Sequence, residues 1–332
     1  MKTILNAIGM RVIVLMLLFG AYIPVLYARG TPESSTAALA IHVVRGPSGL
    51  GMIRMFETPP RVPNFEVRME ALAGADLIAA RFISGEAKVG ILPPNVAARI
   101  RASGKNIQVA AVIGEGMLSL LTIDPSVEDI DDLRGKTVEV AGQASIPDYV
   151  FRTILDVYGI TSDRDVQLGY SLAYPEIALS LVAGRISTAL LPEPFATVAR
   201  MGRNDIRSVA DIQEEWESAG GESNYPMTFL VVDAAFAAAN PGAVQTILAA
   251  VKNSIEWVRA NPAEAGRLAQ KHNFGLRPEV AEAAIGRSNY VFIPAAEARP
   301  SIEALFRVLL QHSPASIGGS LPNDGFYWRE RN

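Results

Sequence analysis

The stretch "SLAYPEIALSLVAGRISTALLPEPFATVARMG", residues 171–202, contains one complete unit of the pattern that decides the fold. Apolar residues recur at helical spacing over 174–185, and the apolar run that follows at 186–194 has the length of a strand. A second helical pattern begins at Phe195. Because a buried strand flanked by helices is typical of a parallel sheet, this stretch predicts an α/β protein.

The same alternation of strands and helices runs along the chain in two series. The first series covers 39–124, and the second begins with a turn and a strand at 127–142. Two such series predict two α/β lobes with right-handed crossovers between parallel strands. After a loose segment, 214–224, and a strand, the C-terminal third is expected to be helical over these ranges: 242–262, 263–274, 278–292 and 301–311.

The composition excludes several classes of protein. The chain has 332 residues, a formal net charge of -4 and no cysteine. Disulfides, thiolate metal sites, cysteine nucleophiles and the lipid-modified cysteine of a bacterial lipoprotein are therefore excluded. The three histidines, His42, His272 and His312, share no ligand spacing, so we expect no metal site and no cofactor. Lysine and arginine form no cluster, which argues against a nucleic-acid partner.

Residues 1–30 have the composition of a secretory signal peptide. Lys2 and Arg11 precede residues 12–28, which carry no charge, and small residues lie near the end of the segment. We expect cleavage after residue 28 or 30. The alternative is an uncleaved membrane anchor, because the uncharged run approaches the length of a membrane span.

Four runs in a fixed order carry a resemblance to a known family; they cover residues 71–113, 129–160, 171–202 and 229–265. Together they resemble the periplasmic substrate-binding proteins of ABC importers. Within that class they are similar to the group for nitrate, sulfonates of the taurine type, bicarbonate and thiamine pyrimidine precursors. The resemblance covers roughly residues 40–270, with Ser187-Thr188 where Asp-Ala is commoner in the family.

The resemblance implies a two-lobed periplasmic-binding-protein fold of type II. Each lobe would be a mostly parallel sheet flanked by helices, and two crossing segments would form the hinge. Lobe 1 would contain residues 38–122 plus 225–332, and lobe 2 residues 123–224. The implied protein is a periplasmic monomer without enzymatic activity. It would hold a small-molecule ligand between the lobes and deliver it to a membrane permease with its ATPase.

Two other functions stay open. One is a membrane-tethered binding or sensor subunit on the same fold. The other is a pyrimidine-precursor enzyme or another enzyme on this fold. The absence of cysteine and of a G-x-S-x-G elbow argues against an enzyme.

Ligands of open α/β sheets lie outside the carboxyl ends of the strands, and the resemblance points to the same loops. In lobe 1 the candidates are Pro47, Ser48 and Gly49, where glycine permits close backbone approach and Ser48 either caps a helix or donates to a ligand. Asn95 is expected to cap the helix that follows it, with a ligand contact as an alternative role.

The second lobe offers further candidates at the same kind of position. Gln143 and Ser145 precede a predicted helix, which Ser145 is expected to cap. Tyr174 presents a flat face and a hydroxyl group at the next strand–helix junction. Tyr225 lies on the predicted return crossing, where it is expected to line the cleft.

Glu193 lies between two prolines directly after a buried strand. A buried carboxylate is costly unless it is paired or hydrogen-bonded. One interpretation is a ligand contact, in which Glu193 accepts hydrogen bonds from an amine, amide or aminopyrimidine. The other is a structural acceptor for backbone N–H groups or a salt bridge at the hinge. The first would disfavour nitrate and bicarbonate and favour a neutral or cationic nitrogen-bearing solute, and the sequence does not name the ligand.

Overall fold

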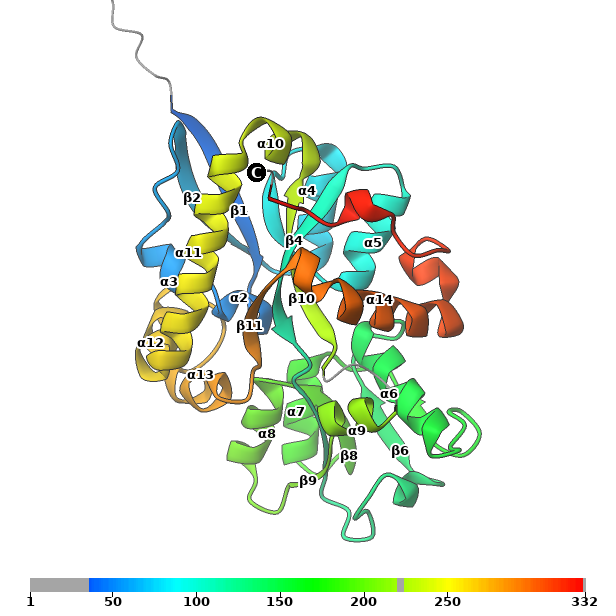
Figure 1. Ribbon diagram of the computed structural model, residues 1–332. Coiled ribbons are helices and arrows are strands. Elements are labelled where there is room, and N and C mark those ends of the chain that lie inside the picture. Colours follow the sequence, from blue (N-terminus) through cyan, green and yellow to red (C-terminus); the bar gives the residue numbers. More distant parts are fainter. Residues whose placement is uncertain (1–35, 220–223, 331–332) are drawn as a thin grey trace, which may run out of the picture. The chain divides into compact units, whose positions relative to one another are not determined.

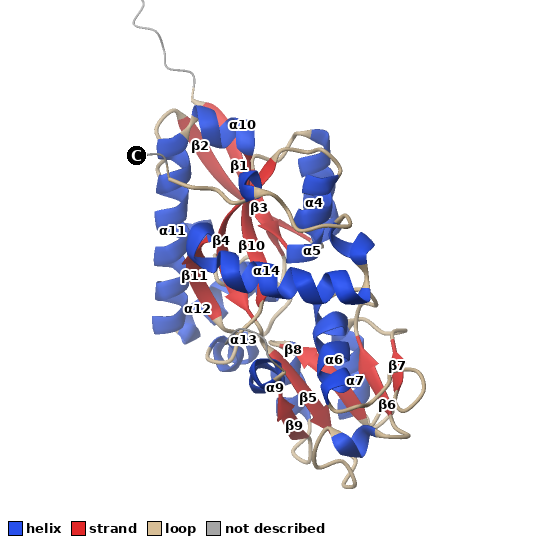
Figure 2. Ribbon diagram, turned by 45° about the vertical axis from the view of Figure 1, so that its right-hand side comes forward, coloured by secondary structure: helices blue, strands red, loops and turns tan. Residues whose placement is uncertain are grey.

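The computed structural model describes residues 36–219 and 224–330. The described residues from Ala37 onward belong to one compact unit, Ala37–Asn332. The expected signal peptide, residues 1–30, lies outside the described residues. The strands form two sheets, which we call sheet A and sheet B, and Figure 2 shows them in red with helices on their faces.

Sheet A has six strands in the order β11-β4-β10-β3-β1-β2. β1 is parallel to β2 and β3, whereas β10 is antiparallel to β3 and β4, and β11 is antiparallel to β4. Every residue of β3 is buried, as expected for a central strand covered on both faces. The strands are β1 (Ala37–Val44), β2 (Phe65–Leu72), β3 (Val89–Leu92), β4 (Ile107–Glu115), β10 (Pro226–Asp233) and β11 (Tyr290–Pro294).

Sheet B has five strands in the order β7-β6-β8-β5-β9. β6 is parallel to β7 and β8, and β5 is antiparallel to β8 and β9. All residues of the central strand β8 are buried, like those of β3. The strands are β5 (Leu118–Thr122), β6 (Thr137–Val140), β7 (Gln167–Gly169), β8 (Thr188–Pro192) and β9 (Arg207–Asp211).

Helices follow most strands and pack on both sheets (Figures 1 and 2). Around sheet A lie α2 (Pro47–Leu50), α3 (Arg54–Glu57), α4 (Ala75–Ser84), α5 (Pro94–Ala102), α10 (Ala234–Ala239), α11 (Pro241–Ala260), α12 (Pro262–Lys271), α13 (Pro278–Ile285) and α14 (Ala295–His312). Around sheet B lie α6 (Ile146–Val157), α7 (Tyr174–Val182), α8 (Phe195–Gly202) and α9 (Ile212–Ser218). Short 3-10 helices are Asp131–Leu133, Pro314–Ile317 and Asp324–Phe326.

Two connecting segments lie side by side where the chain passes between the sheets. The N–H group of Gly116, between β4 and β5, donates to the carbonyl oxygen of Tyr225 (2.8 Å) and to Oδ1 of Asn224 (3.1 Å). The strands adjoining these crossings, β4, β5 and β10, each run antiparallel to both of their neighbours. This arrangement matches the two crossings expected from the sequence.

Two predicted elements differ from the structure. The helix expected over 278–292 ends at Ile285, and Tyr290–Pro294 forms β11, because its aromatic and β-branched side chains suit a strand paired with β4. The segment expected to be loose, 214–224, begins inside α9, where the side chain of the N-cap residue Asp211 accepts from the N–H group of Gln213.

The boundary expected between residues 122 and 123 places Leu118–Thr122 with the first lobe. In the structure this segment is β5, which pairs with β8 and β9 in sheet B. The chain therefore changes sheets near Gly116, before the strand and not after it. The apolar pattern of β5 identifies a strand, but it carries no information about which sheet the strand joins.

Candidate functional site

The loop at the carboxyl end of β1 contacts β11, and the loop at the carboxyl end of β8 contacts the first crossing between the sheets. Tyr290, the first residue of β11, is buried, and its hydroxyl donates to the carbonyl oxygen of Pro47 (2.8 Å). Burial raises the pKa of Tyr290, and the negative charge of Glu193 on sheet B adds to the shift. The N–H group of Glu193 donates to the carbonyl oxygen of Met117 (3.0 Å), and that of Glu115 donates to the carbonyl oxygen of Asn289 (3.2 Å), so Glu193 and the residue before Tyr290 both contact the first crossing. We call this region, with the crossings at Gly116 and Tyr225, the junction.

The β1 loop contributes Pro47, Ser48 and Gly49 to one side of the junction. α2 is a single turn without a side-chain cap, and Ser48 lies inside it, so Ser48 does not cap this helix. A Cβ atom on Gly49 would lie 2.2 Å from the carbonyl oxygen of Val44. Glycine at position 49 therefore lets α2 fold back closely onto the end of β1.

Asn95 does not have the capping role that the sequence suggested. α5 begins at Pro94 with Pro93 at the N-cap, so Asn95 is the second helical residue, and it is 9% exposed. Proline is favoured at the first helical position because its fixed φ suits the helix and its missing N–H group would have no partner there. The predicted ligand contact of Asn95 stays a prediction.

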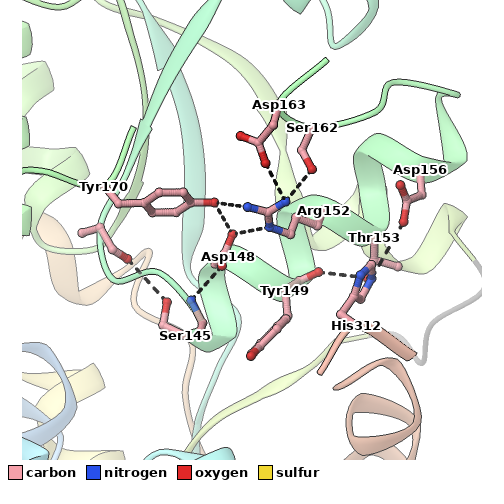
Figure 3. Close-up of polar contacts among 12 residues, drawn as sticks. Ser145, Asp148, Tyr149, Arg152, Thr153, Asp156, Ser162, Asp163, Tyr170 and His312 are labelled. Atoms are coloured by element: carbon pink, nitrogen blue, oxygen red, sulfur yellow. Dashed lines mark hydrogen bonds and ion pairs between the residues drawn. The ribbon is translucent and has the colours of Figure 1, made fainter. Parts of the chain in front are cut away.

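Ser145 is the N-cap residue of α6, as predicted, but its side chain makes no capping hydrogen bond. Its hydroxyl donates to the carbonyl oxygen of Ala141 (3.4 Å, Figure 3), and Ser145 also opposes the rise in the pKa of Tyr174 that burial causes. Gln143, two residues earlier, is exposed. The loop therefore presents two polar side chains that are not used for capping α6.

Tyr174 and Tyr225 connect sheet B to the return crossing. The Tyr174 ring stacks on Phe195 with 5.7 Å between ring centroids, and burial raises the pKa of Tyr174 to about 12. Tyr225 is fully buried, and its hydroxyl donates to Oε1 of Gln213 (2.9 Å). Burial raises the pKa of Tyr225, with smaller contributions from Asp211 and Tyr174. The carbonyl oxygen of Tyr225 accepts from Gly116, which places Tyr225 at the crossing.

Both oxygens of the Glu193 carboxylate have partners within the chain. Oε1 accepts from Nη1 of Arg200 (3.1 Å), and Oε2 accepts from the backbone N–H group of Thr197 (3.0 Å) in the first turn of α8. The residue is 1% exposed. These contacts are those of the structural interpretation, in which a carboxylate stabilises the positive end of a helix dipole. A direct contact with a solute stays a prediction.

Sequence reasoning missed Arg200, Gln213 and Tyr290 at the junction. Burial lowers the pKa of Arg200, and the neighbouring Glu193 opposes this shift. A signal for Arg200 was its place seven residues after Glu193, two turns along the helix. The signal for Tyr290 was the strand-like run of residues 290–293, which was taken for the end of a helix.

The described surface has three hollows, and Tyr290, whose hydroxyl contacts Pro47, lines one of them. One of about 460 Å³ lies beside α10 and residues 324–329, and one of about 550 Å³ lies between α3 and α11. A third, of about 390 Å³, lies between α12 and the α13–β11 connection. None of the three is lined by any of the nine predicted residues.

Within 36–219 and 224–330, no group of three or more histidine, aspartate or glutamate side chains is arranged to hold a metal ion. In the same described ranges, no helix is both long enough and apolar enough to cross a membrane.

A comparison with protein-family models decides the family. The model of the NMT1-like family matches residues 68–272, which is more than half of the chain. The chain belongs to the NMT1-like family. No curated protein matches it.

Solved structures with the same fold are those of binding proteins. An ABC transporter protein from Parabacteroides distasonis is 24% identical with a TM-score of 0.76, covering 89% of this NMT1-like chain and 100% of that chain. The aliphatic sulphonate-binding protein SsuA from Escherichia coli is 15% identical with a TM-score of 0.69, and the match covers 89% of this chain and 92% of SsuA. The nitrate-binding protein NrtA from Synechocystis is 12% identical with a TM-score of 0.56, and the match covers 74% of this chain and 69% of NrtA.

These likenesses confirm the fold expected from the sequence, the type II periplasmic-binding-protein fold with two mostly parallel sheets. The suspected group is also confirmed, because its members include the sulphonate- and nitrate-binding neighbours.

Proposed function

We propose that this protein is the solute-binding component of an ABC importer outside the cytoplasm. It captures a small solute between the two lobes and delivers it to a membrane permease and its ATPase. The observation that carries the proposal is the junction, where Tyr290 contacts Pro47 on the sheet A side and Glu193 on the sheet B side contacts Met117 in the first crossing. Loops at the carboxyl ends of strands are where open α/β sheets bind ligands.

The proposed solute is a small polar molecule, either anionic or nitrogen-bearing. The argument for a nitrogen-bearing solute depended on an unpaired Glu193 carboxylate, but that carboxylate is paired with Arg200 and with a backbone N–H group. Its charge therefore repels an anion less than an isolated carboxylate would. The names of the sulphonate- and nitrate-binding neighbours place anions first in a screen.

We propose the periplasm as the location and a monomer as the working form, in keeping with the signal-like composition of residues 1–30. A membrane-tethered binding or sensor subunit is the alternative. Mass spectrometry of the exported protein discriminates between them, since a chain that starts near residue 29 or 31 has lost its signal peptide.

A thermal-shift screen tests the proposed binding function. The panel contains ethanesulfonate, taurine, nitrate, bicarbonate, aminopyrimidines, thiamine, riboflavin and aromatic carboxylates. A solute at about 100 times its dissociation constant adds about 2.7 kcal/mol to the free energy of unfolding, which gives a clear shift in Tm. Native mass spectrometry of the untreated protein detects a solute that co-purifies. No stabilisation and no co-purified solute would contradict the proposal.

A further inference from the structure

We propose that Asp148 is a positioning residue, which holds residues 142–145 in the conformation that meets the solute. The proposal rests on the proposed function in one respect, the role of this loop in binding. The hydrogen bonds that fix the loop are observed in the structure and do not depend on the proposed function. Figure 3 shows them.

The first observation concerns the backbone at Ala144. Ala144 has a φ of 61°, in the left-handed region that alanine rarely adopts. This conformation costs about 1–2 kcal/mol for a residue with a Cβ atom. The N–H group of Ala144 donates to Oδ2 of Asp148 (2.8 Å), and this charge-assisted hydrogen bond offsets the cost.

The second observation is that the Asp148 carboxylate also accepts hydrogen bonds from two other side chains. Its side chain is 3% exposed, and Oδ1 accepts from Nε of Arg152 (2.8 Å) and from the Tyr170 hydroxyl (2.6 Å). Nη2 of Arg152 donates to that same hydroxyl (2.5 Å), so the three side chains form a closed ring of hydrogen bonds. A buried carboxylate with this many donors has one preferred orientation.

The ring ties together two loops of the junction. Asp148 and Arg152 lie on α6, which follows β6, and Tyr170 directly follows β7. The Tyr170–Tyr174 segment then leads to the tyrosine whose hydroxyl lies close to Ser145. Burial raises the pKa of Tyr170, and the hydrogen bond to Asp148 adds to the shift, so this hydroxyl stays a donor at neutral pH.

Asp148, the third residue of α6, reaches back past the N-cap, much as the acidic residue of a capping box does. Ser145 occupies the N-cap position, yet it makes no capping hydrogen bond, while Asp148 in the first turn accepts from the residue before the cap. The Ser145 hydroxyl and the exposed Gln143 side chain are thereby left for a solute. The fixed loop reduces the ordering cost of binding.

Hydrogen exchange of the full chain without solute tests the positioning role. We expect Asp148→Ala to speed exchange at Ala144 about tenfold, because the loss of one charge-assisted hydrogen bond costs about 1–3 kcal/mol. Asp148→Asn retains an acceptor oxygen and should rescue most of the protection. The matched control is Asp163→Ala, which removes an exposed carboxylate 3.6 Å from Nη1 of Arg152 and leaves the Ala144 contact intact. The amides of β3 serve as the reference for global stability.

Binding is measured in the same variants with ethanesulfonate and nitrate as probes. We expect the dissociation constant to rise about tenfold in Asp148→Ala and to recover in Asp148→Asn, in proportion to the loop protection. Unchanged exchange at Ala144 in Asp148→Ala overturns the positioning role, whatever the probes do. Changed exchange with an unchanged dissociation constant overturns the link to binding. If wild-type protein binds neither probe, the anionic solute class is refuted, and the exchange result still decides the role of Asp148.

Where Asp148→Ala does not fold, Tyr170→Phe provides the second test. It removes one donor to Oδ1 and keeps the contact between Oδ2 and Ala144. We expect the exchange rate of the Ala144 N–H group to rise less than threefold. The lost hydrogen bond has a neutral donor and does not involve the Ala144 N–H group directly. A larger increase than in Asp148→Asn would contradict the assignment of the positioning role to the Asp148 carboxylate.

Discussion

Glu193 and Arg200 form an ion pair of 3.1 Å between Oε1 and Nη1 at the start of α8, with only 2% of the Glu193 side chain exposed. The same guanidinium donates through Nη2 to the hydroxyl of Ser119 on β5 (3.0 Å). The pair therefore joins the end of β8, the helix that follows it and the strand beside it.

The first prediction concerns this pair. Glu193→Gln keeps the shape and one acceptor oxygen but removes the charge that compensates Arg200. Because the Arg200 side chain is 25% exposed, water screens part of the loss, and we expect the free energy of unfolding to fall by about 1–3 kcal/mol. Urea denaturation measures it.

Asp205→Asn is the matched control for this variant. It removes the negative charge from an exposed ion pair, Arg203–Asp205, just beyond the same helix. The free energy of unfolding should fall by less than about 1 kcal/mol. An equal loss in both variants would contradict the structural role of Glu193. The same proteins decide its role in binding: a weaker solute affinity only in Glu193→Gln assigns a direct contact, and unchanged affinity assigns a structural carboxylate.

Tyr174→Ala is expected to weaken solute binding about tenfold while the protein stays folded, because the ring offers a flat contact surface worth about 1 kcal/mol or more. Tyr174→Phe keeps the stack on Phe195 and removes only the hydroxyl near Ser145. Calorimetric titration with the best solute of the screen measures both. Retained affinity in Tyr174→Ala would count against the assignment of this residue to the site.

Gly116→Ala tests the crossing of the two connecting segments. A Cβ atom at this position would lie 2.5 Å from Cζ of Tyr225 and from Oδ1 of Asn224. We expect a loss of about 1–3 kcal/mol in the free energy of unfolding, since the buried tyrosine has to shift. Gly242→Ala in α11, where a Cβ atom would meet open space, is the control and should be neutral or slightly stabilising. Equal free energies of unfolding for Gly116→Ala and Gly242→Ala would show that the two connecting segments can move apart at no cost in stability.

A pH dependence follows from His42, which is buried on β1. Burial lowers its pKa below 6.5; Arg81 adds to the shift, whereas Glu70 and Glu86 oppose it. Nδ1 of His42 lies 3.1 Å from Nη1 of Arg81 and 3.3 Å from Oε2 of Glu70; in the neutral ring with its proton on Nε2, Nδ1 accepts from Arg81. The unfolded chain therefore binds more protons than the folded one between the two pKa values, so stability rises with pH in that window and falls as the pH drops through it.

The measurement is urea unfolding at about pH 7.5 and about pH 5, the range in which histidine titrates, for wild type and His42→Gln. Glutamine can still accept from Arg81 but does not titrate, so the decline in stability towards the lower pH should be smaller in the variant. The other two histidines are present in both proteins and cancel in the comparison. Equal declines would refute a buried, neutral His42.

The fold was predictable from the sequence because its strands are marked locally. The all-apolar β3 and β8, each followed by a proline-bounded turn and a helix, identify the parallel units without any knowledge of their partners. The choice of sheet for β5 and the strand at Tyr290 depend on pairing with strands distant in the chain, so local patterns failed there.

The candidate site was less predictable for a related reason. Strand ends indicated the candidate loops, but the partners of each side chain lie on other elements. The structural interpretation of Glu193 depends on its contact with Arg200, seven residues later. Asn95 does not cap its helix, because the helix begins at Pro94 with Pro93 as the N-cap residue. The contacts of Asp148 with Arg152 and Tyr170 likewise depend on the folded lobe.

Calorimetric titration of the best solute from the screen into wild type, Ser145→Ala and Gln108→Ala tests the central claim most directly. Ser145 lies at the junction, and Gln108 lines the hollow beside α10, remote in the fold from the predicted loops. We predict binding of one solute per chain, weakened about tenfold in Ser145→Ala through the loss of a hydrogen bond and unchanged in Gln108→Ala. Equal affinity in wild type and Ser145→Ala, with a loss confined to Gln108→Ala, would place binding in that hollow and contradict the junction as the solute site.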